Sequence, residues 1–235
     1  MSTDRDQLKR AAAMRAIKEV KDGMVVGLGT GSTAAFVVEG LAARVADGLR
    51  VVGIPTSERT AAQARRLGIP IATFAEHQRI DLTIDGADEV ELGTLHLIKG
   101  LGGALLREKI VAAASDRLVI VVDYEKLVER LGEHTPVPVE VTQFGWQATA
   151  VALAKLGCVP ERRYTTGEQP YVTDGGNYIL DCRFGPLADP GAIEQRVALM
   201  VGTIESGLFI QRTSVVVVAS ATGVELLVPP APKRA

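Results

Sequence analysis

Cysteine, histidine and aromatic residues are scarce in this sequence, and their scarcity excludes several classes of protein. The two cysteines, Cys158 and Cys182, match no CxxC or Cys/His zinc spacing, and two thiols do not make a disulfide framework. The three histidines, His77, His96 and His134, are spread along the chain, so none is expected to act as a metal ligand or a catalytic base. A chain that needs no disulfides is expected in the reducing cytoplasm.

Strong net charge and long apolar runs are also absent. With 26 basic and 28 acidic residues the formal net charge is −2, so the chain offers no basic field to attract a nucleic-acid backbone. No apolar run approaches the length that spans a bilayer, and the first residues lack the apolar core of a signal peptide. We therefore expect a soluble cytoplasmic protein that binds neither nucleic acid nor membrane, and any phosphate-bearing partner should be a small molecule.

Small and branched apolar residues, in contrast, are abundant. Apolar residues make up 47% of the chain, mostly Ala, Val and Leu, as in buried parallel strands covered by helices. In the first half, predicted strands alternate with predicted helices, which indicates an α/β fold with a doubly wound, mostly parallel, Rossmann-like sheet. The predicted strands are 24–28, 49–54, 69–73, 80–84 and 118–122, and the predicted helices are 5–20, the segment after turn 27–33, 57–67 and 104–114.

The pattern changes after Asp123, and a second unit is predicted there. Its predicted elements follow the order β-α-β-β-α-β, which is the ferredoxin-like α+β arrangement. The glycines of 174-DGGN-177 predict a hairpin between strands 171–173 and 178–183. Strands 215–219 and 225–228 are expected to rejoin the first sheet. The sequence thus predicts a large domain of residues 1–130 and 208–235 with a small inserted domain of residues 131–207. The other predicted elements of the small domain are strand 137–142, a helix stopped by Gly157, strand 161–165, helix 190–200 and strand 203–209.

A glycine-rich turn, 27-GLGTGST-33, joins the first predicted strand to the next helix. Free backbone N–H groups and the helix dipole favour an anion at such a turn, and Thr30, Ser32 and Thr33 add hydroxyl donors. A P-loop is excluded because the turn has no lysine, and GxGxxG is excluded because Ser32 stands in place of the third glycine. The turn predicts either a phosphate site or only a tight strand-to-helix connection.

The segment 85-DGADEV-90 follows the apolar strand 80–84 directly, which places Asp85 and Asp88 at the carboxyl end of a sheet strand. Ligands of open α/β sheets bind at that edge, and the small residues Gly86 and Ala87 allow close approach to the backbone. Two other interpretations are an acidic turn with Asp85 as a helix cap and a divalent-metal site. The metal site is disfavoured because no further ligand lies at a suitable spacing.

In the third segment, 99-KGLGGALLREKI-110, a lysine precedes a glycine cluster and the chain then enters a helix. Glu108 lies about one turn into that helix, on its polar side. Taken alone, the pattern favours an ordinary helix start in which Arg107, Glu108 and Lys109 face solvent.

The segments GTGST, DGADE and KGLGGALLREK, in that order and in a chain of this length, resemble the metal-independent ribose-5-phosphate isomerase A family. The likeness extends to Lys126 after the strand that ends in Asp123, to the extended VPVEV segment and to TDGGNYILD. Two departures are Leu101, where the family often has a glycine, and a segment from Asp88 to Lys99 that is a residue longer than in some members.

The resemblance implies an aldose–ketose isomerase that interconverts D-ribose 5-phosphate and D-ribulose 5-phosphate through an enediolate, in the non-oxidative pentose phosphate pathway. It implies that Glu108 is the proton acceptor, that Lys99 and the amides of 100–103 stabilise the oxyanion, and that Asp85 assists ring opening. No cofactor or metal is expected. The implied substrate-binding residues are Thr30, Gly31, Ser32, Thr33, Asp85, Gly86, Ala87, Asp88, Lys99, Gly100, Leu101, Gly102 and Lys126.

Other functions on related folds stay open at this point. A non-catalytic sugar-phosphate sensor would need a DNA-binding segment, for which the first predicted helix leaves no room. An acyl-CoA transferase-like or sugar-phosphate deaminase-like enzyme would also use a glutamate, but Lys99 and the DGAD segment fit polyol recognition better. Exposed strand edges and the resemblance lead us to expect a homodimer or homotetramer, and Lys9 is expected on a solvated helix face.

Overall fold

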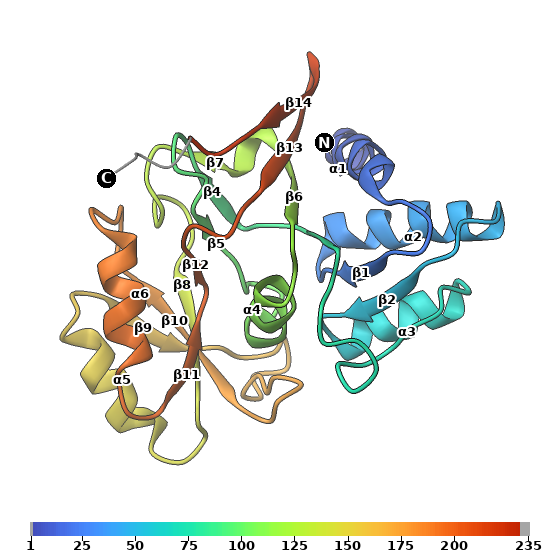
Figure 1. Ribbon diagram of the computed structural model, residues 1–235. Helices are drawn as coiled ribbons and strands as arrows, with labels where there is room; N and C mark the ends of the chain where they lie inside the picture. The colour runs from blue at the N-terminus through green and yellow to red at the C-terminus, as the bar shows by residue number, and fades with distance from the viewer. Residues whose placement is uncertain (1, 231–235) are drawn as a thin grey trace, which may run out of the picture.

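The structure is a computed structural model that describes residues 2–230, with side chains from Arg5 onward. Its largest sheet has six strands (Figure 1). Its order is β14-β13-β6-β3-β1-β2, and all neighbours are parallel except β13 and β14. The predicted doubly wound, mostly parallel sheet is therefore confirmed. The strands are β1 (Val25–Leu28), β2 (Val52–Pro55), β3 (Leu82–Asp85), β6 (Leu118–Asp123), β13 (Val215–Ser220) and β14 (Gly223–Leu227).

Helices cover both faces of this sheet because its strands are apolar on both sides. Val119 and Val121 of β6 pack in the core under α1 and α2, whereas Ile120 and Val122 pack on the opposite face with Ala112 of α4. This alternation is the two-residue period of a strand. No helix within residues 2–230 is long and apolar enough to cross a membrane. The helical elements are α1 (Ser2–Ala16), η1 (Ile17–Glu19), α2 (Ser32–Ala46), α3 (Glu58–Arg66), α4 (Leu105–Ala113) and η2 (Tyr124–Lys126).

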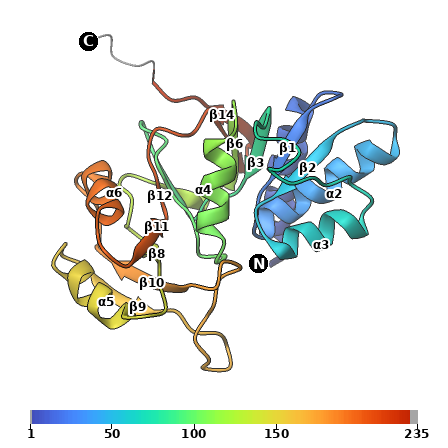
Figure 2. The ribbon, with the colours of Figure 1, turned by 60° about the horizontal axis from the view of Figure 1, so that its bottom comes forward.

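A smaller antiparallel sheet has the order β11-β8-β10-β9, and its chain order β-α-β-β-α-β is the predicted ferredoxin-like arrangement. Helices α5 and α6 cover one face of it, where Leu153 and Val197 pack on Val139 and Leu180 (Figure 2). Helix α4 contacts β8 and β11 and so lies between the two sheets. The elements are β8 (Val137–Val141), α5 (Trp146–Ala154), β9 (Val159–Arg162), β10 (Tyr178–Arg183), α6 (Pro190–Ala198) and β11 (Thr203–Ser206).

A third sheet, of order β12-β5-β4-β7, was not predicted. Its strands are two or three residues long, too short to show a period in the sequence. Its pairing joins segments far apart in the chain, such as Val90 with Leu127 and Phe209 with Leu97. The strands are β4 (Glu89–Glu91), β5 (Leu97–Ile98), β7 (Leu127–Val128) and β12 (Leu208–Phe209).

Three strand predictions were wrong. Residues 69–73 form only an isolated bridge, between Gly53 and Ile71. Residues 171–173 form no strand, and the predicted hairpin with 178–183 is absent because β10 pairs with β8 and β9 instead. The predicted strand 203–209 is divided at Gly207, because β11 pairs with β8 and β12 pairs with β5 of another sheet. At the division the backbone of Lys99 passes close by, and a Cβ on Gly207 would lie 2.1 Å from its carbonyl oxygen.

The division into a large domain, residues 1–130 and 208–235, and a small domain, residues 131–207, stays a prediction. The antiparallel sheet lies within the second range, and the strands of the other two sheets lie within the first. Residue 1 and residues 231–235 of these ranges lie outside the described part of the chain.

Candidate active site

The predicted site lies where the direction of strand order changes. Strand β2 is on one side of β1 and β3 is on the other, so the loops that follow β1 and β3 begin side by side at the carboxyl edge of the sheet. Gly29 makes this approach possible, because a Cβ at that position would lie 2.6 Å from the Cα of Asp85. The backbone N–H of Thr30 then donates to Asp85 Oδ1 at 3.1 Å.

All three polar segments meet around one cavity of about 160 Å³. Of the predicted site residues, Asp85 and Leu101 are not in its lining. Three further residues, Arg5, Lys9 and Asp123, are. The lining consists of Arg5, Lys9, Thr30, Gly31, Ser32, Thr33, Gly86, Ala87, Asp88, Lys99, Gly100, Gly102, Glu108, Asp123 and Lys126.

The glycine-rich turn leads into α2 and leaves backbone donors free at the cavity. The first backbone bond of α2 is from Ala35 N–H to the Gly31 carbonyl, at 3.0 Å, so the amides before Ala35 have no partner within the helix. Lys9 and Lys126 add positive charge to the same cavity. Donors, helix dipole and two ammonium groups together suit a phosphate.

The hydroxyl of Thr30 is held in a cluster of buried hydroxyl groups. Its Oγ1 lies 2.7 Å from Thr56 Oγ1 and 2.8 Å from Ser57 Oγ, and Ser57 caps α3 through the N–H of Thr60. Both neighbours come from the β2–α3 connection, which the sequence did not connect with the site. The cluster fixes the turn before α2 against a neighbouring strand.

Lys99 is buried and shares its charge between two carboxylates. Its Nζ lies 2.9 Å from Asp85 Oδ2 and 3.2 Å from Glu108 Oε1, and it donates to the Gly86 carbonyl at 2.6 Å. Desolvation opposes the charged form, but the carboxylates of Asp85 and Glu108 outweigh it and raise the pKa of Lys99. Lys99 is therefore an ammonium group at neutral pH.

Glu108 is the group in the cavity whose surroundings suit a general base. It is only 4% exposed, and its Oε2 has no hydrogen-bond partner among the described residues, whereas Oε1 accepts from Lys99. Burial, reinforced by the negative charges of Asp85 and Asp88 and opposed by Lys99, raises the pKa of Glu108 to about 8. A carboxylate with one free oxygen and a pKa near neutrality has the properties of a general base.

The raised pKa predicts how activity depends on pH. A base works only when ionised, so kcat/KM should rise with pH through an inflection well above the ordinary 4.5 of a glutamate and towards about 8. The measurement is kcat and kcat/KM across about pH 5 to 9. The substrate's phosphate titrates near pH 6, and its contribution is identified by the same inflection in competitive inhibition by a simple phosphate monoester that cannot be isomerised. An activity plateau that begins near pH 5 would contradict the expected value.

The two aspartates of DGAD occupy different positions. Asp85 is 1% exposed and lies beneath the cavity, where its oxygens accept from Thr30 N–H and Gly86 N–H and pair with Lys99. Asp88 lines the cavity and accepts from the N–H of Leu101 at 2.9 Å. Burial raises the pKa of Asp88, against the opposing charges of Lys99, Lys126 and Arg163. Asp88 is thus the aspartate that can touch a ligand.

Two of the four amides predicted as oxyanion donors are already engaged. The N–H of Leu101 donates to Asp88, and the N–H of Gly103 donates to the Gly100 carbonyl. The N–H groups of Gly100 and Gly102 have no partner within the described residues, and both glycines line the cavity. The available donors are therefore these two amides.

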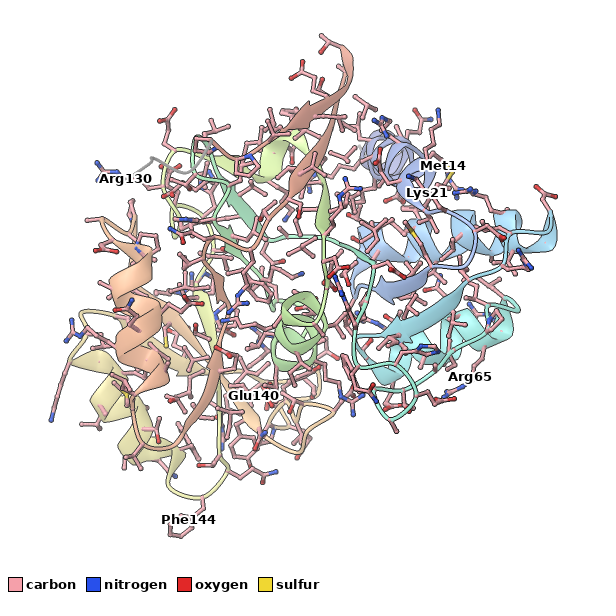
Figure 3. All side chains as sticks on the ribbon, in the orientation of Figure 1. Met14, Lys21, Arg65, Arg130, Glu140 and Phe144 are labelled. Carbon is pink, nitrogen blue, oxygen red and sulfur yellow. The ribbon has the colours of Figure 1, made fainter. Side chains whose placement is uncertain are left out.

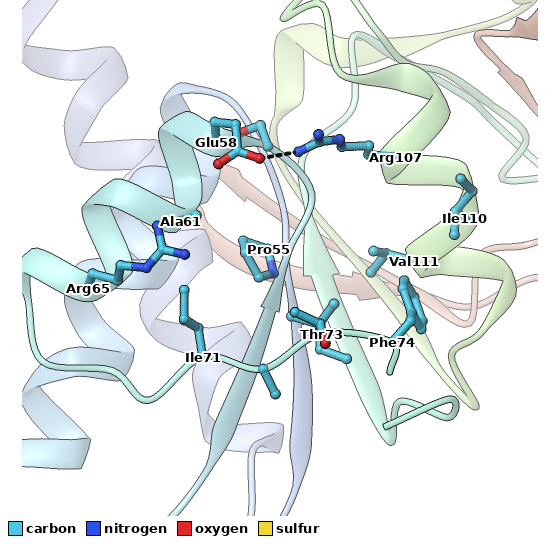
Figure 4. A pocket seen from close by; sticks show the side chains of 13 residues that line it. Pro55, Glu58, Ala61, Arg65, Ile71, Thr73, Phe74, Arg107, Ile110 and Val111 are labelled. Atoms are coloured by element: carbon cyan, nitrogen blue, oxygen red, sulfur yellow. Dashed lines mark hydrogen bonds and ion pairs between the residues drawn. The ribbon is translucent and has the colours of Figure 1, made fainter. Parts of the chain in front are cut away.

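A larger cavity, of about 350 Å³, lies nearby between α3 and α4 (Figure 4). Its walls are mainly apolar, from residues such as Ile71, Phe74 and Val111, and Arg107 at its rim pairs with Glu58 at 2.8 Å. It contains no lysine and no carboxylate other than Glu58. Glu108, Lys99 and the glycine-rich turn all line the smaller, polar cavity instead.

Lys9, Arg5 and Asp123 are site residues that the sequence did not predict. Asp123 ends β6 at the carboxyl edge of the sheet, and the rule that identified Asp85 would have found it. Lys9 was expected on a solvated helix face, but it lines the cavity because α1 packs against β6 and β13. No local pattern carries that information.

The chain is similar to known proteins both in sequence and in fold. The chain matches the family model for ribose 5-phosphate isomerase A (phosphoriboisomerase A) over residues 52–223. It is 64% identical to ribose-5-phosphate isomerase A of Gloeobacter violaceus over 97% of this chain and 99% of that one. Its fold is similar to a solved D-ribose-5-phosphate isomerase in complex with phospho-erythronic acid (TM-score 0.92, 37% identity, 95% and 99% coverage) and to ribose 5-phosphate isomerase from Plasmodium falciparum (TM-score 0.92, 39% identity, 96% and 100% coverage).

Proposed function

The chain belongs to the ribose-5-phosphate isomerase A family and is an aldose–ketose isomerase that interconverts ribose 5-phosphate and ribulose 5-phosphate, and we propose that Glu108 carries the proton between C1 and C2. The observation that supports this role is the free Oε2 of a nearly buried carboxylate facing a cavity that also contains the anion turn. The alternative of a non-catalytic sensor is not favoured, because the relatives that match this chain end to end are named as isomerases.

In the direction from aldose to ketose, Oε2 of Glu108 removes the proton from C2 of the open-chain sugar. The C2–H electron pair forms the C1–C2 double bond of an enediolate, and the carbonyl pair moves to O1. Glu108 then returns a proton to C1, while O1 gains a proton and O2 loses one to become the ketose carbonyl. One carboxylate serves both carbons because they are adjacent.

The negative charge on O1 needs donors that are in place before the reaction. We assign this role to the amides of Gly100 and Gly102, together with the ammonium of Lys99. Asp85 acts through Lys99, whose position it fixes, rather than by touching the sugar. Asp88, which lines the cavity, binds the sugar hydroxyls and also takes the ring-opening role that was predicted for Asp85.

The phosphate end of the substrate is assigned to the opposite part of the cavity. Residues 31–33 offer free amides there, Ser32 and Thr33 add hydroxyls, and Lys126 and Lys9 supply positive charge. Binding energy from this remote group orients C1 and C2 against Glu108.

The proposed proton transfer by Glu108 is tested by measuring isomerisation without an added metal. Among the described residues no group of three or more His, Cys, Asp or Glu side chains is arranged to hold a metal ion. Purified protein that has been treated with a chelator is therefore expected to convert ribose 5-phosphate to ribulose 5-phosphate at the untreated rate, measured by the ketose formed. Folded protein that stays inactive until a divalent metal is restored would contradict the assigned chemistry.

The reaction is proposed to serve the non-oxidative pentose phosphate pathway, in the cytoplasm. A homodimer or homotetramer is also proposed. Exposed apolar side chains in the connections of the small antiparallel sheet support it. Phe144, between β8 and α5, is 96% exposed (Figure 3), and Leu199 and Val201, between α6 and β11, are 87% and 92% exposed.

A further inference from the structure

The glycine loop of the active site is held from outside by an arginine of the small antiparallel sheet. Arg163, directly after β9, donates from Nη1 to the carbonyls of Gly100 at 2.8 Å and Leu101 at 3.1 Å. The rest of its guanidinium is held by Asp181 of β10, with Nε to Oδ2 at 2.9 Å and a second bond from Nη2 to Oδ1. The side chains are 12% and 19% exposed, so this arrangement is mostly withdrawn from solvent.

The two carbonyls belong to two successive peptide units, and each unit also carries an N–H. A trans peptide is planar, so the C=O of one residue and the N–H of the next point to opposite sides. In the unit from Gly100 to Leu101, Arg163 holds the C=O and Asp88 accepts from the N–H. In the unit from Leu101 to Gly102, Arg163 holds the C=O, and the N–H of Gly102 has no partner among the described residues.

We propose that Arg163, oriented by Asp181, is a positioning residue that directs the N–H of Gly102 into the cavity as a donor to the substrate oxyanion. This inference rests on the proposed function, specifically on the roles of Glu108 and of the loop amides. The small sheet contributes to the reaction through this contact, although none of residues 127–230 lines the cavity.

A neighbouring contact supports the same role for this part of the fold. Tyr171 packs so closely on the loop that a Cβ at Gly103 would lie 2.0 Å from its hydroxyl oxygen, and Gly103 has a φ of +83°. The guanidinium of Arg163 lies 6.0 Å from the centre of the Tyr171 ring. The loop is thus restrained by two side chains of the segment 163–171.

The test compares Arg163→Gln with Arg162→Gln. Arg162 is the preceding residue and stacks on Trp146 and Tyr164, away from the loop, so its substitution controls for general disturbance of the small sheet. Arg163→Gln is expected to lower kcat by about 10²-fold, the effect of a misplaced reacting group, with KM for ribose 5-phosphate changed by less than about threefold. Arg162→Gln should leave kcat within about twofold of the wild type.

Two inhibitors separate the two ends of the site. Phospho-erythronic acid carries a carboxylate where the enediolate has its oxygens, so Arg163→Gln should weaken its inhibition by a factor similar to the loss of kcat. Inhibition by inorganic phosphate, which needs only the anion turn, should be unchanged.

Asp181→Asn should give a smaller loss of the same kind, and the double variant should be no worse than Arg163→Gln alone, because Asp181 acts through Arg163. Arg163→Lys keeps the positive charge but loses the planar guanidinium that bonds Asp181 and the two carbonyls together. Its activity should therefore be little higher than that of Arg163→Gln.

Several results would overturn the proposal. They are wild-type kcat in Arg163→Gln, an equal loss in Arg162→Gln, or equal weakening of both inhibitors, which would indicate general distortion. If Arg163→Gln does not fold, Asp181→Asn decides by the same two inhibitors. Failure of the proposed function is seen separately, since Glu108→Gln would then keep its turnover whatever the result for Arg163.

Discussion

Replacing Glu108 by Gln is expected to lower kcat by about 10²- to 10⁴-fold, the contribution of a general base, while KM for ribose 5-phosphate changes little. Gln keeps the size and the hydrogen bond to Lys99 but cannot accept a proton from carbon. The phosphate contacts are made by other residues, so binding of the substrate should persist. The measurements are steady-state kinetics and exchange of the C2 proton with solvent in the bound sugar, which should disappear together with turnover.

The stability of this variant is a useful control. Because the pKa of Glu108 is raised in the folded state, the folded protein binds more protons than the unfolded chain between about pH 4.5 and 8. Ionisation of Glu108 therefore costs stability as pH rises through this range, and Glu108→Gln should be at least as stable as the wild type at pH 8. A control is Glu194→Gln. Glu194 lies on α6 and pairs with Lys109, the neighbour of Glu108 on α4, and its substitution should leave turnover unchanged. Normal turnover in Glu108→Gln would remove the central assignment.

Part of the predicted site follows from rules that act over a few residues. Thr30 lies two residues after β1 and Asp85 ends β3, and the carboxyl ends of parallel strands meet at one edge. Glu108 could not be separated from its neighbours on pattern alone, and the structure shows Arg107 partly exposed while Glu108 and Lys109 are buried. Here the resemblance, rather than the helical period, identified the base.

What the sequence did not predict depends on contacts between distant segments. Two of the three strand pairs of the third sheet, β4 with β7 and β5 with β12, join residues 37 or more positions apart, and all its strands are too short to show a period. Arg163 is 62 residues from the loop that it holds, and nothing near it in sequence points to Leu101. That Asp85 lies beneath the cavity also follows from packing, since only the fold decides which of two nearby aspartates turns towards Lys99.

Replacing Lys99 by Met is expected to have a large effect on both stability and activity. Removing the cation leaves Asp85 and Glu108 buried without their shared partner, and breaking a buried ion pair in this way costs about 3–5 kcal/mol of the free energy of unfolding. The pKa of Glu108 should rise further, because Lys99 is the charge that lowers it. Activity should fall by about 10²- to 10³-fold, as for loss of an oxyanion donor, and more at neutral pH than at pH 9.

Lys109→Met separates these two effects. Lys109 is also buried and paired with two carboxylates, Glu194 and Glu205, and both lysines lie against the ring of Phe209, at 5.5 Å for Lys99 and 4.9 Å for Lys109. It should therefore lose a comparable amount of stability in thermal unfolding while kcat at a permissive temperature stays near the wild-type value. Adding Asp85→Asn to Lys99→Met removes one uncompensated charge and should restore part of the stability but none of the activity. If Lys99→Met lost only stability, as Lys109→Met is expected to, Lys99 would serve to keep the carboxylates folded and would not stabilise the enediolate.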